Sequence, residues 1–148
     1  MPHTDDLRHQ DDAATAMIDK LLKLSHHCDT FDQAYCLALQ VAKLASLLRT
    51  HFAQEDCTLY AILFDCGDPE VSRLALDYFQ DLGGLAEKLE MFAFRWCSPD
   101  TIRAGSKSFK PELTELCAQL SRRIALENAY LYPMAESVLA RKLAVWPD

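Results

Sequence analysis

Apolar residues recur at alternating intervals of three and four along most of this 148-residue chain, a spacing that places them on one face of an α-helix. The chain holds only 4 glycines and 6 prolines, and most of them fall between the periodic segments or at their ends. A sandwich or barrel needs a turn about every ten residues, so this scarcity of turn residues argues against an all-β fold. The sequence therefore predicts long helices that share one core.

The periodic segments predict four long helices joined by short connections. Their expected ranges are 11–26, 30–65, 69–96 and, from the extent of its apolar stripe, 111–138. Thr30 and Gln33 have the spacing of a capping box at the start of the second helix. This organisation predicts an all-α, up-down four-helix bundle that forms a single domain over residues 1–148, and it leaves open whether residues 1–10 pack on it or stay loose.

Breaks are expected inside two of these helices. Gly83 and Gly84 interrupt the third segment and favour either a bend or a close contact with another helix. Pro133 lacks the amide hydrogen that an interior helix position requires, so it is expected to kink the fourth helix.

Composition and charge exclude several classes of protein. Hydrophobic residues make up 50% of the chain and charged residues 25%, which is enough for a core and excludes disorder. The net charge is -7, so no broad positive surface is expected to bind nucleic acid or an anionic membrane. The acidic N-terminal segment and the lack of a long apolar run favour a cytoplasmic protein. Its six cysteines are expected to be reduced thiols.

Two apolar stripes each contain a polar pair where core residues are expected. His51 and Glu55 lie one turn apart on the second helix, and Arg123 and Glu127 repeat the arrangement on the fourth. A buried carboxylate without a partner is strongly unfavourable, so these groups need a compensating charge from an arginine or a metal ion. Metal sites in bundle cores are built from such pairs on facing helices.

The residues around these pairs carry a family resemblance. The first segment is His51-Phe52-Ala53-Gln54-Glu55-Asp56 followed by Leu59-Tyr60, and the second is Arg123-Ile124-Ala125-Leu126-Glu127-Asn128 followed by Leu131-Tyr132-Pro133. Together they resemble the two halves of a hemerythrin-like domain, the HHE cation-binding family. The resemblance covers nearly the whole chain, including the order and lengths of the helices. It implies a four-helix bundle around a non-haem di-iron centre, with further histidine ligands on the first and third helices.

The chain departs from this family pattern at three of the four expected histidines. Arg123 stands where the second pair should begin with histidine, and Tyr78 lies on the inward stripe of the third helix where the family has another. On the first helix the matching position falls at Asp11 or Asp12, and His9 is the only imidazole near it. The resemblance therefore implies a degenerate metal site.

Two interpretations of this core follow. In the first, which the charge of Arg123 favours, its guanidinium repels metal and pairs with Glu55 or Glu127, while His51 and Tyr78 complete a hydrogen-bonded network without a cofactor. The protein would then be a non-enzymatic regulatory or interaction protein with a protein partner or a homo-oligomer. In the second, the same His51, Glu55 and Glu127, with Tyr78 or an N-terminal aspartate, hold one iron or manganese ion. This would make a binder or sensor of oxygen, nitric oxide or iron status.

Three weaker signals complete the sequence analysis. Cys57 follows Glu55 by two residues, so a thiol redox sensor is a third interpretation. Phe94 falls off the apolar stripe of the third helix and, if exposed, marks a surface for a partner or a dimer. No nucleophile elbow, phosphate-binding loop or dinucleotide motif is present, so no catalytic residue is predicted.

Overall fold

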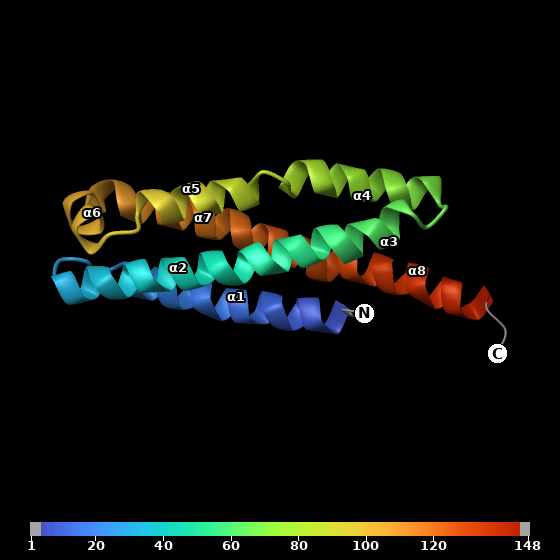
Figure 1. Cartoon of the computed structure of the whole chain (residues 1–148), viewed down its shortest axis with the longest axis horizontal. Coiled ribbons are helices and arrows are strands. Elements are labelled where there is room, and N and C mark those ends of the chain that lie inside the picture. The colour runs from blue at the N-terminus through green and yellow to red at the C-terminus, as the bar shows by residue number, and fades with distance from the viewer. Residues whose placement is uncertain (1–3, 146–148) are drawn as a thin grey trace.

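The computed structural model describes residues 4–145, and this part of the chain is all-α, as predicted. The elements in chain order are α1 (Thr4–Leu24), α2 (Phe31–Gln54), the π-helical turn η1 (Glu55–Leu59), α3 (Tyr60–Phe64), α4 (Pro69–Leu82), α5 (Leu85–Arg95), α6 (Pro99–Ala104), α7 (Ser106–Leu126), the π-helical turn η2 (Glu127–Leu131) and α8 (Tyr132–Val145). Figure 1 shows an elongated molecule in which successive helical stretches run alongside one another in alternating directions.

The first helix begins earlier than the sequence analysis predicted. It starts at Thr4 and not near Asp11, with two acidic residues in its first turn that interact favourably with the helix dipole. Leu7 is buried in the core, and Arg8 forms an ion pair with Glu136 of α8 at 2.6 Å. Residues 4–10 are therefore an ordered part of the packed structure.

The second predicted helix is a continuous rod made of α2, η1 and α3. Its capping box is confirmed, since the Thr30 hydroxyl accepts from the Gln33 amide at 3.2 Å and the Gln33 side chain accepts from the Thr30 amide at 3.2 Å. After α3, Gly67 adopts a φ of 77°, which L side chains rarely tolerate, and Asp68 caps the start of α4.

The other two predicted helices differ from expectation at their ends and breaks. Gly83 and Gly84 separate α4 from α5, so the third helix is divided where a bend was expected. The fourth begins at Ser106 and not near Pro111, because Phe109 is fully buried against Trp96 and holds the additional turn on the core. The π-helical turn η2 precedes Pro133, but η1 has the same geometry with no proline after it, so the kink expected at Pro133 stays a prediction.

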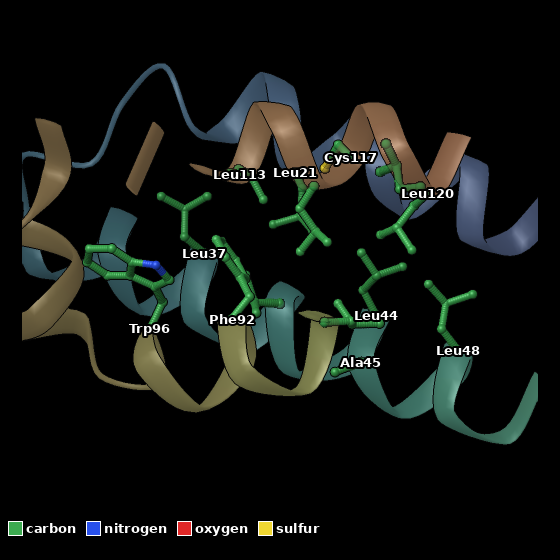
Figure 2. Packing of buried hydrophobic residues seen from close by; sticks show 14 of the residues in the cluster. Leu21, Leu37, Leu44, Ala45, Leu48, Phe92, Trp96, Leu113, Cys117 and Leu120 are labelled. Carbon is green, nitrogen blue, oxygen red and sulfur yellow. The ribbon is translucent and has the colours of Figure 1, made fainter. Parts of the chain in front are cut away.

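Two apolar clusters fill the interior on either side of a polar region. Figure 2 shows part of the larger cluster, where leucines of α2 and α7 face Phe92 of α5 and Trp96, which directly follows α5. The smaller cluster joins α3, α4 and α8 around Leu59 and Leu131. Along α2 and α7 the polar pairs fall between residues of the two clusters, so the candidate site interrupts an otherwise apolar core.

Candidate metal centre

Four side chains from three helical stretches converge between the two apolar clusters. Asp11 comes from α1, His51 from the last turn of α2, and Glu55 and Glu127 are the first residues of η1 and η2. All four are fully buried, with 0% of their surface exposed. One potential ligand atom from each lies within 4.8 Å of all the others. Among the described residues this is the only such group of at least three histidines, cysteines or carboxylates.

The imidazole of His51 presents one nitrogen to all three carboxylates. Its Nδ1 donates to the amide oxygen of Gln10 at 2.6 Å, which turns Nε2 toward the acidic residues. Nε2 lies 2.9 Å from Asp11 Oδ1 and 3.3 Å from Glu127 Oε2, and it also contacts Glu55 Oε1. A single N–H cannot point at three oxygens at once, and Asp11 Oδ1 and Glu55 Oε1 are left without a hydrogen bond from the described residues.

The opposite sides of the three carboxylates are held by neighbouring side chains. The hydroxyl of Tyr132 lies 2.6 Å from Asp11 Oδ2 and 2.8 Å from Glu127 Oε2. Arg123 donates from Nη2 to Glu55 Oε2 at 3.1 Å and from Nε to Glu127 Oε1 at 2.9 Å. Partners of this kind orient metal-binding carboxylates in proteins, because they fix one oxygen and leave another directed at the ion.

The side chain of Arg123 is buried and makes contacts beyond the two glutamates. Only 4% of its surface is exposed, and its guanidinium carbon lies 3.8 Å from the centroid of the Phe52 ring. Its Nη1 donates to the main-chain oxygen of Leu82 at 3.1 Å. That carbonyl is available because α4 ends at Leu82, before the Gly83 and Gly84 break. A Cβ at Gly84 would meet nothing within 4 Å and one at Gly83 would meet only Phe79 of its own helix, so the glycines make a break and not the alternative of a close contact with another helix.

Each polar pair ends where its helix changes to π geometry. The amide of Tyr60 donates to the main-chain oxygen of Glu55, and the amide of Tyr132 donates to that of Glu127, each five residues back. Single π turns occur frequently at functional sites, because the added residue changes the direction of the side chains that follow. The two halves of the site thus share a π-helical turn as well as a sequence pattern.

Burial and mutual contacts shift the ionisation of these groups in opposite directions. Burial lowers the pKa of His51, but its contacts with Asp11, Glu127 and Glu55 outweigh burial and raise the pKa to about 11. Burial and the hydrogen bond to Glu127 raise the pKa of Glu55 to about 8. Burial also acts to raise the pKa of Glu127, but hydrogen bonds to Glu55 and His51 and the charge of Arg123 lower it to about 2. At neutral pH Glu55 is therefore the glutamate that tends to hold a proton, while Glu127 is ionised.

The formal charges of the cluster do not balance without two additional positive charges. Asp11, Glu55 and Glu127 carry three negative charges when ionised, and Arg123 supplies one positive charge. Protons on His51 and on one glutamate would neutralise the remaining two, and so would a single divalent cation with a neutral imidazole. Arg123 is therefore compatible with one divalent ion.

One residue of the predicted site lies elsewhere. Tyr78 is half-buried against the smaller apolar cluster and stacks on Tyr130 with ring centroids 6.3 Å apart, so its prediction as an inward site residue is wrong. The reason is that α4 packs against α3 and reaches the site only at its C-terminal end, through the Leu82 carbonyl. His9 and Asp12 are exposed, which leaves Asp11 as the contribution of α1.

Sequence reasoning assigned no role to Gln10 or Tyr132 and did not choose Asp11 over its neighbour. A signal for Asp11 existed, because it falls on the buried stripe of α1 in register with the apolar residues Leu7, Ala14, Ile18 and Leu21. A first helix that begins at Thr4 includes Leu7, which places Asp11 inside the buried stripe and not at its start. Tyr132 follows Leu131 in the quoted motif, but no pattern within the sequence shows that its hydroxyl reaches α1.

The cysteines are dispersed, and all six are free thiols. Cys57 is exposed and Cys117 is buried, and burial raises the pKa of the Cys117 thiol to about 11. A raised pKa suppresses the reactive thiolate, so Cys117 is unsuited to redox sensing.

Comparisons with known proteins found no match to a family model, a curated protein or a solved structure. Within the described part of the chain, every helix is too short or too polar to span a lipid bilayer.

Proposed function

We propose that this chain is a four-helix bundle of the hemerythrin-like type that binds one divalent iron or manganese ion through Asp11, His51, Glu55 and Glu127. The observation that carries the proposal is the convergence of these four buried donors, two of which keep a carboxylate oxygen without a hydrogen-bond partner. Buried polar atoms are nearly always partnered in native proteins, so the two oxygens point to a ligand between them.

The donor set favours iron or manganese. Three carboxylates and one imidazole form an oxygen-rich site, whereas structural zinc sites are rich in cysteine and histidine. Bound iron would supply Lewis acidity and a change of oxidation state. These properties suit a non-enzymatic binder or sensor.

The position of Arg123 explains why we propose one ion and not the pair that the family resemblance implies. Its guanidinium occupies the side of Glu55 and Glu127 opposite to His51, where it binds Glu55 Oε2 and Glu127 Oε1. A permanent charge there supplies what a second ion would otherwise provide. The proposal therefore departs from a metal-free network, because arginine and one divalent ion can share the same carboxylates.

Metal content tests this proposal directly. Protein expressed with added iron and manganese, and purified without chelator or affinity metal, should carry about one equivalent of divalent ion per chain by elemental analysis. Asp11→Asn should lose most of this ion, because it removes the charge of a donor. Asp12→Asn is the matched control, since Asp12 is adjacent and exposed, and it should retain the wild-type content. A wild-type protein that stays metal-free after incubation with Fe²⁺ or Mn²⁺ would contradict the proposal and favour the metal-free network.

A second candidate function, self-association, is favoured by the surface between α5 and α7. Phe94 is 85% exposed and Met91 65% exposed, and both line a groove with a volume of about 1040 Å³. The α5 wall carries both Lys88 and Glu90, and its Arg95 is already paired with Glu112 of the α7 wall at 2.5 Å. We infer a second copy of the chain as the occupant, because a two-fold axis would bring the exposed apolar side chains of one copy against those of the other.

The oligomeric state checks this second candidate. Sedimentation of the wild-type chain should show a dimer at micromolar concentration, and Phe94→Ser should shift it to the monomer. Leu143→Ser, which changes an apolar residue that is 77% exposed at the far end of α8, should leave the dimer intact. A monomeric wild type, or equal effects of the two substitutions, would exclude this groove as a dimer interface.

A further inference from the structure

Tyr60 and Tyr132 occupy matching positions in the two halves of the site but differ in their partners. Each follows its glutamate by five residues, directly after the π-helical turn. The Tyr132 hydroxyl bonds to Asp11 and Glu127, whereas the Tyr60 hydroxyl has no hydrogen-bond partner among the described residues. Only 2% of Tyr60 is exposed, so its hydroxyl is a buried polar group that calls for a partner.

A small hollow lies beside Tyr60 and Arg123. Its volume is about 60 Å³, and its apolar walls include Phe52 and Phe79. Gly83 lines it from the break between α4 and α5, where the chain is exposed. One water needs only about 10–15 Å³ on this measure, so the hollow accommodates a molecule of about three or four heavy atoms.

Of the polar side chains that line the hollow, Tyr60 and Arg123 are hydrogen-bond donors and Asp56 is an acceptor. Tyr60 offers its O–H, since burial raises the pKa of the phenol and keeps it protonated. Arg123 has five N–H groups, and three bonds engage it with Glu55, Glu127 and the Leu82 carbonyl, which leaves donors free. A ligand that accepts hydrogen bonds from Tyr60 and Arg123 must therefore carry an accepting oxygen.

The charge around the hollow disfavours an anion. The positive charge of Arg123 is already matched by Glu55 and Glu127, and Asp56 adds a carboxylate at the edge of the hollow. A buried anion without a free counter-charge would be costly, so an uncharged molecule fits better.

We propose that this hollow is a second binding site, which takes a small uncharged carbonyl compound of three or four heavy atoms, with its oxygen accepting from Tyr60 and Arg123. None of the residues that line it is among the four proposed metal ligands. The proposal therefore stands apart from metal binding, and either one can fail without the other.

Nuclear magnetic resonance titration of the full chain in the presence of chelator tests this site, with formamide as the neutral probe and formate as the anionic probe. Formamide should give saturable shifts of the Gly83 and Tyr60 amides, and formate should not. Tyr60→Phe should keep the fold, because the lost hydroxyl has no protein partner, and should weaken formamide binding about tenfold through the lost hydrogen bond.

Two further variants separate binding in the hollow from effects on the helix break. Ala86→Leu should abolish the shifts by filling the hollow, since Ala86 lines it. Gly84→Ala should leave them unchanged, because a Cβ there meets nothing within 4 Å. Gly83 is avoided, because a Cβ there would lie 2.6 Å from the Phe79 carbonyl oxygen. The proposal is overturned if formamide gives no saturable shift, if Tyr60→Phe binds it as well as wild type, or if formate binds more tightly.

Discussion

Replacing Arg123 with alanine should lower the free energy of unfolding by ~3–5 kcal/mol in the presence of chelator, the cost of removing one partner from a buried ion pair. The guanidinium is 4% exposed and bonds to Glu55, Glu127 and the Leu82 carbonyl. Its loss leaves Glu127 without its arginine partner, and it leaves Glu55 Oε2 and the Leu82 main-chain oxygen without a donor. Urea denaturation followed by circular dichroism measures the change.

Arg122→Ala is the matched control for this substitution. Arg122 is the preceding residue, its side chain is 61% exposed, and it pairs with Asp81 across the surface at 3.0 Å. Exposed ion pairs of this kind contribute about 0–1 kcal/mol, so the control should stay close to wild type. If the two variants lose similar amounts of stability, Arg123 does not hold the core together and the charge balance argued for the site is wrong.

Binding of the ion should raise the midpoint of thermal unfolding by ~5–10 °C when free metal is about 100-fold above its dissociation constant. Linkage gives ~2.7 kcal/mol at that ratio, and a chain of this length gains ~2–4 °C for each kcal/mol. Glu55→Gln should abolish this increase while leaving the metal-free protein nearly as stable as wild type. The reason is that the pKa of Glu55, raised to about 8, keeps its carboxyl neutral at pH 7 without metal.

Calorimetry with Mn²⁺, repeated with Fe²⁺ under argon, measures both effects. Glu90→Gln serves as the control, because Glu90 lies on the surface in an ion pair with Arg49 and is remote from the four donors. It should keep the full metal-dependent increase. A wild-type midpoint that does not respond to either ion, or a Glu55→Gln variant that responds fully, would argue against Glu55 as a ligand.

The periodicity of the sequence anticipated the helices and the buried polar pairs. His51, Glu55, Arg123 and Glu127 are all buried, as their places on apolar stripes predicted. Helix boundaries were less well predicted, and α1 shows why. The prediction stopped at the acidic run around Asp11, although the same stripe continues to Leu7 and α1 begins at Thr4.

In the third predicted helix, the apolar stripe did not predict correctly which side chain reaches the site. Tyr78 lies on the apolar stripe drawn through residues 69–96, but the chain breaks at Gly83, so one stripe does not describe both α4 and α5. Tyr78 packs on Tyr130, and the contribution of α4 to the site is a main-chain oxygen. No side-chain pattern can predict that contact, because it depends on where the helix ends relative to Arg123.

The sequence by itself determined which segments are helical and which polar residues point inward, because both follow from the 3.6-residue repeat and need only neighbours along the chain. Only the tertiary structure decided that Asp11 meets Tyr132 and that Arg123 spans Glu55, Glu127 and Leu82. These partners are far apart in sequence, and their contacts are set by how the helices pack, in rotation and in register along their axes. The same packing left the Tyr60 hydroxyl beside a hollow while its counterpart found two carboxylates.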